Sequence, residues 1–406
     1  MFRTTTPART GKQFVAVALA LPLLLTACGS SSSSSSASSS GSSETTDPSV
    51  VSGAQKLIEE GVAGMVAAAK PENDITLADW EPATGWTPPP TTVATPTAKK
   101  VYVIACAAVA PFCNDVAEGA VDAAHQIGWD ATFLDGKGTP QGFADAFQTA
   151  IAGKPDAILT MAIPESVAGT YIAEARDKGI KTIGISSVSE AGTPADRKYD
   201  AYVSARENPN AQLEAWWTIA DSGGKANVAY IWDPAFPFLV ESLAAAKKVF
   251  AQCAGCTVEE VVNTDIPTLA DPGKAQQVAV SLLQQHPDVD YVLLPYGIGT
   301  RSVIDAAKSL GRDIKVVNKN SDPVNIGLVH SGLLAQENGT SPAMAGWAGV
   351  DQAIRVLGGG EPLADWEPNL PIHVYVSNNA PATGTFDWDK ATDYKSKYLE
   401  LWGAAK

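Results

Sequence analysis

The chain has 406 residues, of which 45% are hydrophobic, and a formal net charge of −15 at pH 7. Nucleic-acid binding needs clustered Lys and Arg, so this negative net charge argues against a nucleic-acid partner. The part of the chain that follows the N-terminal 47 residues is long enough for two ordinary domains.

The N-terminus has the pattern of an export signal over residues 1–28. Basic residues precede an apolar run over 14–25, which is too short to span a bilayer as a mature helix. The run ends in Leu-Thr-Ala-Cys28, which resembles the lipobox of bacterial lipoproteins. The resemblance implies cleavage before Cys28, lipidation of its sulfur and anchoring in the lipid bilayer at the outer face of the cytoplasmic membrane. An ordinary secretory signal with a chance cysteine is the alternative.

A serine-rich tract over 29–47 cannot bury apolar area, so a flexible tether is expected there. Residues 48–99 form the next segment. Helical periodicity over 50–69 predicts a helix. The Pro- and Thr-rich stretch over 80–99 predicts an extended segment along the surface.

From Lys100 onward, short β-branched runs alternate with longer amphipathic stretches. This spacing predicts βαβ units with parallel sheets covered by helices on both faces. The alternation is too long for one sheet of usual size and pauses near 204–210, so we expect an α/β fold of two Rossmann-like lobes. The predicted strands cover 101–104, 131–134, 157–161, 182–185, 228–231, 258–262, 291–294 and 314–317. The predicted helices cover 114–127, 140–152, 165–178, 235–252, 275–285 and 300–310.

Four cysteines follow Cys28. An even number in an exported protein predicts two disulfides, and the simplest pairing joins Cys106 to Cys113 and Cys253 to Cys256. The CxxC spacing of the second pair also occurs in redox and zinc sites. No second CxxC and no nearby histidine accompanies it, so a structural disulfide is favoured.

The first lobe carries a strand, a Pro-Phe loop, a helix with a central glycine and a Gly-aromatic turn: Val101–Cys106, Pro111-Phe112, Glu118–Ala120 and Gly128-Trp129. The segments 179–183 and 286–290 continue the pattern. The sequence resembles the type I periplasmic binding protein family, in its ribose-binding-like branch, a fold shared with the sensor domains of LacI-type repressors. The N-terminal helix, the Pro/Thr segment and the Cys106/Cys113 pair resemble a lipoprotein subgroup common in actinobacteria.

The resemblance implies two lobes joined by a hinge of three crossovers that closes around a ligand. The crossovers are expected near 204–208, 338–341 and 368–372. The expected N-terminal lobe is 100–205 plus 341–368. The expected C-terminal lobe is 206–340 plus 369–406. The implied partner is an ABC permease in the membrane.

The sugar contacts of the family carry over unevenly. The aromatic after the first strand matches Phe112, whereas an Asp-Arg pair falls on Ser186 and Ser187, and a second-lobe Arg near Ala244 is missing. Where the family has an Asn after a second-lobe strand, this sequence has Tyr296, and where the family has an Asp after the following strand, it has Asn320. The hinge Gln of the family falls near Thr340. The charged groups that hold a pentose or hexose are therefore largely absent. This indicates a less polar ligand.

Trp232, Phe236, Tyr296 and Asn320 follow predicted strands, where open α/β sheets bind ligands. Aromatic faces and planar polar groups are typical of sugar sites, so we expect this group to line the cleft. Core packing is the alternative for each aromatic. Ser186 and Ser187 either donate hydrogen bonds to a ligand or only complete a turn. Asp233 is either a ligand acceptor or a helix cap.

An enzyme is not expected, because the four histidines are scattered and no nucleophile elbow, complete phosphate loop or metal-ligand spacing occurs. No cofactor and no metal is predicted. A DNA-binding regulator would need a basic helix-turn-helix before Lys100, where the signal and tether lie instead. The expected function is a substrate-binding lipoprotein of an ABC importer that captures a small sugar or polyol. A sensor lipoprotein, or a carrier of an aromatic compound or modified sugar, is the alternative.

Overall fold

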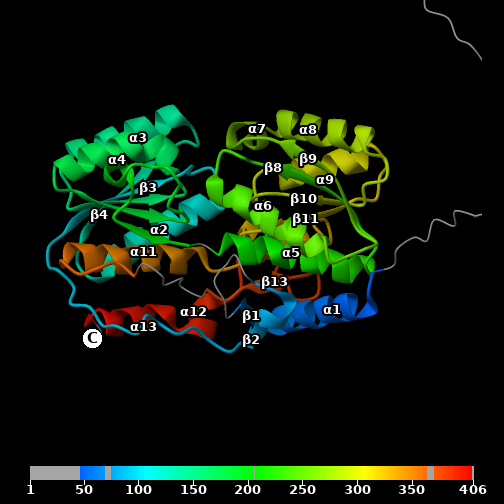
Figure 1. The fold of residues 1–406 in the computed structure, drawn as a ribbon, viewed down its shortest axis with the longest axis horizontal. Helices are drawn as coiled ribbons and strands as arrows, with labels where there is room; N and C mark the ends of the chain where they lie inside the picture. Colours follow the sequence, from blue (N-terminus) through cyan, green and yellow to red (C-terminus); the bar gives the residue numbers. More distant parts are fainter. Residues whose placement is uncertain (1–45, 69–74, 205, 364–369, 405–406) are drawn as a thin grey trace, which may run out of the picture. The chain divides into compact units, whose positions relative to one another are not determined.

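The computed structural model of the protein describes residues 46–68, 75–204, 206–363 and 370–404. The predicted signal, the lipidation site Cys28 and nearly all of the predicted tether lie outside these described residues. The described chain contains two sheets that are mainly parallel, each with helices on both faces (Figure 1). Within the described chain, no helix has the length and apolar character needed to cross a membrane.

The first sheet belongs to the N-terminal lobe and is parallel throughout. Its strands are β3 (Lys100–Ala105), β4 (Asp130–Asp135), β5 (Ala157–Met161), β6 (Lys181–Ile185) and β7 (Ala201–Val203), in the order β4-β3-β5-β6-β7. Its helices are α2 (Pro111–Gln126), α3 (Pro140–Ala152), α4 (Glu165–Asp177) and α11 (Pro342–Leu357). Helices α3 and α4 cover one face, and α2 and α11 cover the other (Figure 1).

The second sheet belongs to the C-terminal lobe. Its strands are β8 (Asn227–Trp232), β9 (Thr257–Asn263), β10 (Tyr291–Leu293), β11 (Lys315–Lys319), β12 (Gln336–Gly339) and β13 (His373–Tyr375), in the order β13-β12-β11-β10-β8-β9. Only β13, at the edge, runs antiparallel to its neighbour. Its helices are α5 (Glu207–Ser222), α6 (Pro237–Phe250), α7 (Ile266–Ala270), α8 (Pro272–Gln285), α9 (Thr300–Ser309) and α10 (Pro323–His330).

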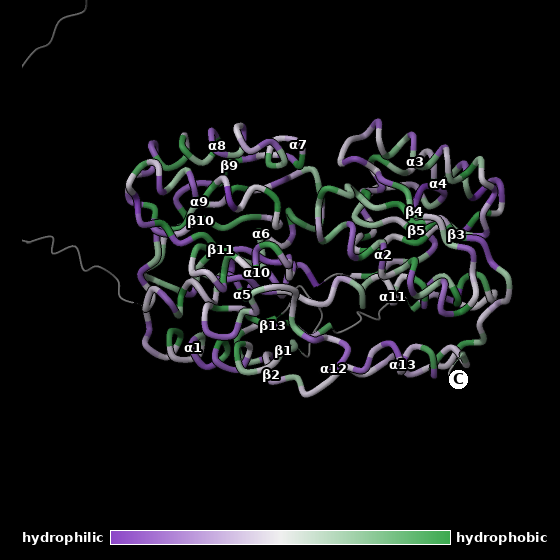
Figure 2. The backbone as a smooth tube through the Cα atoms, turned by 180° about the vertical axis from the view of Figure 1, so that it is seen from behind, coloured by the Kyte–Doolittle hydropathy of each residue, from purple (hydrophilic) through white to green (hydrophobic). Residues whose placement is uncertain are grey.

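The predicted α/β fold of two lobes with parallel sheets is confirmed. Each predicted strand and helix from residue 101 onward has a counterpart in the structure, with ends that differ by a few residues. These strands could be predicted because they are mainly hydrophobic, as β5 and β10 are (Figure 2), and every residue of both is buried. Strands covered by helices on both faces need such continuous apolar runs.

An N-terminal layer packs against the C-terminal lobe. Helix α1 (Pro48–Ala63) contacts α5, and β1 (Met65–Ala68) pairs with β2 (Trp80–Ala83), which follows the 3₁₀ turn η1 (Leu77–Asp79). The helix predicted over 50–69 is therefore too long. The observed helix ends at Ala63 with Gly64 as its C-cap, and Val66 then exchanges backbone hydrogen bonds of 2.9 and 2.8 Å with Ile372.

The segment after β2 runs on to the N-terminal lobe. Val93 donates its backbone N–H to Leu401 over 3.2 Å, and the indole of Trp129 donates to the carbonyl of Pro96 over 2.8 Å. The last helices, α12 (Trp388–Thr392) and α13 (Tyr394–Leu401), follow β13. The segment thus ties the C-terminal helix to the first lobe.

The position of helix α13 differs from the expectation that all of 369–406 belongs to the C-terminal lobe. Strand β13 does lie in that lobe's sheet, but α13 packs on α11 of the other lobe. The stacked rings of Trp347 and Trp402, with centroids 5.4 Å apart, explain this, because the C-terminal aromatics bury their faces there. The remaining boundaries between the lobes, and the third crossover at 368–372, stay predictions.

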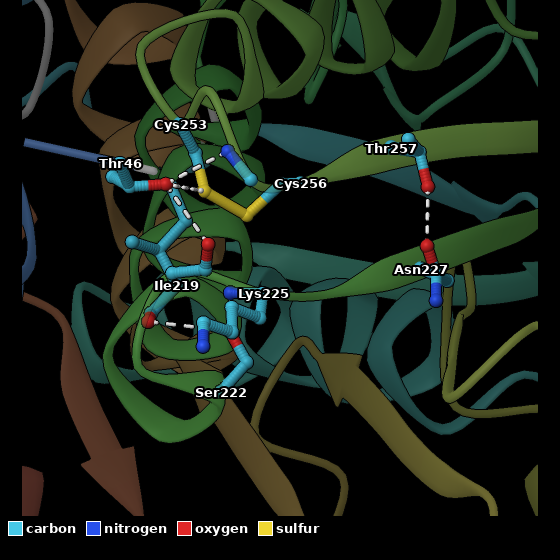
Figure 3. Close-up of a disulfide and its surroundings, with 10 residues drawn as sticks. Thr46, Ile219, Ser222, Lys225, Asn227, Cys253, Cys256 and Thr257 are labelled. Atoms are coloured by element: carbon cyan, nitrogen blue, oxygen red, sulfur yellow. Dashed lines mark hydrogen bonds between the residues drawn. A yellow bond between two sulfur atoms is a disulfide. The ribbon is translucent and has the colours of Figure 1, made fainter. Parts of the chain in front are cut away.

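The two predicted disulfides, Cys106–Cys113 and Cys253–Cys256, are both present. The second lies beside Thr46, the first described residue (Figure 3). The Thr46 hydroxyl donates to the carbonyl of Gly224 and accepts from the N–H of Gly255, each over 2.9 Å. The CxxC loop therefore holds the start of the described chain in place, which fits a structural disulfide.

Helices α2 and α11 approach so closely that Gly346 leaves no room for a side chain. A Cβ there would lie 2.3 Å from the carbonyl oxygen of Val116 and 2.4 Å from the nitrogen of Ala120. We expect Gly346→Ala to lower the free energy of unfolding by about 1–3 kcal/mol, because the helix backbones must separate. Urea unfolding measures this. The control is Gly327→Ala in α10, where the nearest atom lies at 3.5 Å. An equal loss in both variants would contradict the packing argument.

Candidate functional site

The carboxyl ends of the strands in both sheets face one interlobe cavity of about 40 Å³. This is the volume of about one or two water molecules. The loops that follow β3, β5, β8, β10 and β11 all contribute to it, together with the start of α5. Its lining residues from the N-terminal lobe are Cys106, Ala110, Pro111, Phe112, Cys113, Met161 and Ala162. Those from the C-terminal lobe are Glu207, Phe236, Phe238, Leu239, Ile266, Pro295, Tyr296, Gly297, Ile298 and Asn320.

Aromatic rings make up much of the wall. Phe112 comes from the first turn of α2, and Phe236 precedes the first turn of α6. The rings of Phe236 and Phe238 have centroids 5.6 Å apart, and Tyr296 follows β10 in the same lobe. Rings from both lobes therefore present flat apolar faces to a ligand that binds between the lobes.

Tyr296 is held by Asp233, a residue at the end of β8. The phenol of Tyr296 donates to Asp233 Oδ2 over 2.9 Å, and Asp233 Oδ1 accepts from the N–H of Ala235 over 2.9 Å. Burial raises the pKa of Asp233, and these hydrogen bonds partly offset the effect. Asp233 is absent from the cavity lining. It thus caps the turn that leads into α6 and orients an aromatic of the site.

The polar end of the cavity consists of Glu207 and Asn320. Glu207 opens α5, is 4% exposed and accepts a hydrogen bond from the ammonium of Lys319 through Oε2. Asn320 follows β11, is 5% exposed and has φ of 92°. Its Oδ1 is buried without a hydrogen-bond partner among the described residues. A buried acceptor without a partner is costly, so this oxygen is suited to a donor from a ligand.

Four of the eight residues predicted to contact ligand line this cavity: Phe112, Phe236, Tyr296 and Asn320. The other four are buried but do not line it: Ser186, Ser187, Trp232 and Thr340. The hydroxyl of Ser187 donates to the carbonyl of Ile185 over 3.3 Å, and the indole of Trp232 donates to the carbonyl of Leu239 over 2.7 Å. Trp232 therefore packs in the core here. The hydroxyls of Ser186 and Thr340 have no partner among the described residues, and their contact with a ligand stays a prediction.

Sequence reasoning missed Glu207, the acidic residue of the cavity. An acidic side chain in the first turn of a helix is common, because it stabilises the positive end of the helix dipole. Nothing in the sequence distinguishes Glu207 from such a residue. Only its place within the predicted crossover near 204–208 offered a signal.

The Cys106–Cys113 disulfide is itself part of the wall, since both cysteines line the cavity on either side of Phe112. We expect the double variant C106S/C113S to bind ligand roughly tenfold more weakly, because the Phe112 loop gains freedom that binding must remove. Calorimetric titration measures the affinity. The control is C253S/C256S, which also lacks one disulfide but lies away from the cavity. Unchanged affinity in C106S/C113S would contradict this role.

The described part of the chain contains no group of three or more His, Cys, Asp or Glu side chains able to hold a metal ion. The cavity lining also includes no histidine, serine or threonine. An arrangement of aromatic faces around two acceptor groups is suited to binding a small molecule.

Residues 101–361 match the family described as periplasmic binding protein domain. The match covers more than half of the 406 residues, so the chain belongs to this family. The predicted resemblance is thereby confirmed, while membership of the actinobacterial lipoprotein subgroup stays a prediction. A comparison with curated proteins gives no significant match.

Solved structures with the same fold include three ABC transporter solute-binding proteins. The protein from Agrobacterium vitis, with bound allitol, is 17% identical, with a TM-score of 0.61 over 70% of this chain and 97% of that chain. The protein from Actinobacillus succinogenes, with bound D-allose, is 16% identical, with a TM-score of 0.61 over 70% and 99% of the two chains. The protein from Mycobacterium smegmatis, with bound glycerol, is 16% identical, with a TM-score of 0.60 over 71% and 98%. At these identities the likeness shows the fold, that of the type I periplasmic binding proteins.

Proposed function

We propose that the chain is the extracytoplasmic substrate-binding lipoprotein of an ABC importer, and that it captures a small sugar or polyol between its lobes. The observation that carries this proposal is the cavity at the strand ends, whose wall is supplied by both lobes. A ligand there joins the lobes, and the closed form is what an ABC permease would recognise. The bound allitol, D-allose and glycerol of the solved relatives support this ligand class.

The small volume of the cavity bears on the mechanism. Ligand pockets usually measure about 300–1,000 Å³, whereas this cavity measures about 40 Å³. A sugar therefore needs the lobes or the aromatic side chains to separate before it can enter. Hinge motion is the means that a protein of two lobes offers for this.

A thermal-shift screen of the purified protein against sugars and polyols tests the proposal. A ligand at 100 times its dissociation constant adds about 2.7 kcal/mol to the stability of the folded state, an easily measured shift. Phe236→Leu should shrink the shift, because it removes an aromatic face from the cavity. Phe147→Leu, a fully buried ring in α3 outside the lining, is the matched control. A screen without any shift would contradict the proposal.

The membrane anchor needs a separate experiment. In cells given labelled palmitate, the native chain should take up label and Cys28→Ser should not, because the thioether forms on that sulfur. Label in both chains would contradict lipidation at Cys28.

A less polar ligand is the second candidate, favoured by the apolar character of most lining residues. A methylated or deoxy sugar, or a small aromatic compound, fits such a wall better than a fully hydroxylated hexose. Shifts with these compounds alone would keep the binding role and change the substrate class.

A further inference from the structure

A fully buried ion pair lies behind the polar end of the cavity. Lys319 ends β11 with a side chain that is 0% exposed, and its ammonium donates to Glu207, whose side chain is 5% exposed. The ammonium also lies 5.8 Å from the centroid of the Trp232 ring. Glu207 lines the cavity and Lys319 does not. Lys319 therefore reaches the cavity wall through its contact with Glu207.

A second carboxyl group, Glu214, lies two turns further along α5. It is 0% exposed, and neither of its oxygens has a hydrogen-bond partner among the described residues. Burial raises its pKa well above the ordinary value, while Lys319 lowers it and Glu207 raises it. Glu337, which is also 0% exposed, interacts with the same ammonium, and burial raises its pKa well above the ordinary value as well. More than one ionised carboxylate beside one ammonium would leave a buried net negative charge, which is strongly unfavourable. Glu214 and Glu337 are therefore the neutral acids, and Lys319 balances Glu207.

The charge of the remaining wall limits which ligands can enter. None of the described residues lining the cavity is Lys, Arg or His. An anionic ligand would meet the Glu207 carboxylate without a cation to hold it. A cationic ligand would compete with Lys319 for Glu207 and leave an uncompensated positive charge. A neutral ligand keeps the buried pair balanced.

The polar end presents acceptors. Glu207 Oε2 is occupied by Lys319, and the structure shows no hydrogen bond to Glu207 Oε1 from any described residue. Asn320 Oδ1 is the second acceptor without a partner among those residues. These two acceptor oxygens at the polar end of the cavity can be satisfied by two donors on the ligand. Two neighbouring hydroxyl groups supply such donors. The aromatic and aliphatic wall favours a ligand with an apolar face.

We propose that Lys319 is a positioning residue that keeps Glu207 ionised and in place, so that the cavity selects a neutral ligand. This ligand has two hydroxyl donors at one end and an apolar face at the other, as a deoxy sugar or a deoxy polyol has. The inference deepens the proposed function and rests on it for the identity of the ligand. The state of the Lys319–Glu207 pair, however, does not depend on any ligand.

The selectivity is tested with three compounds of matched shape that carry hydroxyl groups at one end and a methyl group at the other: 6-deoxyallitol, the corresponding acid 6-deoxyallonate and the corresponding 1-amino compound. At pH 7, we expect 6-deoxyallitol to bind at least tenfold more tightly than either charged compound. Glu207→Gln should weaken 6-deoxyallitol binding roughly tenfold, because a charge-assisted hydrogen bond is lost. Glu59→Gln, exposed on α1, is the control. Tighter binding of the acid or of the amine would overturn the selection.

Infrared difference spectra test the pair without any ligand. The native protein minus Glu207→Gln should show an ionised carboxylate. Lys319→Met minus the double variant K319M/E207Q should show a protonated carboxyl instead. Glu207 protonated in the native protein, or still ionised without Lys319, would overturn the positioning role. If Lys319→Met does not fold, the first spectrum still decides whether Glu207 is ionised. Binding of none of the three compounds, with both spectra as expected, would count against sugar binding and leave the pair assigned.

Discussion

Replacing Asp351 with Ala should lower the free energy of unfolding by about 3–5 kcal/mol, because it leaves a buried guanidinium without its counter-ion. Asp351 Oδ2 accepts from Arg355 Nε over 2.9 Å, and Asp351 Oδ1 accepts from the indole of Trp402 over 2.8 Å. The side chains of Asp351 and Arg355 are 0% and 5% exposed. Arg355 also donates to the hydroxyl and the carbonyl of Thr91, each over 3.0 Å. One carboxylate thus organises contacts among α11, the extended segment and the C-terminus.

Urea unfolding of matched variants measures this. The double variant D351A/R355M should recover much of the loss, because no unpaired charge remains. The control is Asp305→Ala, which breaks the exposed Arg301–Asp305 pair and should cost at most about 0.5 kcal/mol. A loss for Asp351→Ala as small as that of the control would contradict the role of the buried pair.

Glu214→Gln should make the protein more stable at neutral and alkaline pH. Burial raises the pKa of Glu214 in the folded state above the ordinary value of 4.5. The folded state therefore binds the proton more tightly than the unfolded state, and stability falls as pH rises from about 4.5 to the folded pKa. Within that window the loss reaches about 1.4 kcal/mol per pH unit for one group. Gln has the same shape and stays neutral, so the variant escapes this loss.

Urea unfolding at a series of pH values between about pH 5 and pH 8 gives the comparison. The native protein should lose stability toward the alkaline end more steeply than Glu214→Gln does. Glu337, whose pKa burial also raises, leaves part of the slope in both proteins. Glu241→Gln, exposed on α6, should follow the native protein. Parallel curves for the native protein and Glu214→Gln would show that Glu214 is not a buried acid.

The strands of both sheets could be predicted because parallel strands covered on both faces require continuous apolar runs. Strand β12 was not predicted, since Gln336–Gly339 is a polar sequence that is nevertheless completely buried. Helix α5 was missed for a related reason. It buries polar residues such as Gln212 and Glu214, so no clear apolar stripe marks it.

The cavity could be predicted in part, because the rule that ligands bind beyond the strand ends identified Phe236, Tyr296 and Asn320. The same rule placed Trp232 in the cleft, although its side chain turns into the core of the second lobe. The direction in which a side chain points at a strand end depends on packing across the sheet. Glu207 and its partner Lys319 come together from α5 and β11, which no sequence pattern connects.

Hydrogen–deuterium exchange with and without the neutral sugar or polyol that gives the largest thermal shift tests the central claim most directly. If ligand binds between the lobes and closes them, amides of 106–113 in the first lobe should be protected together with those of 233–239 and 295–298 in the second. Protection in only one lobe, or in segments away from the cavity, would contradict the account.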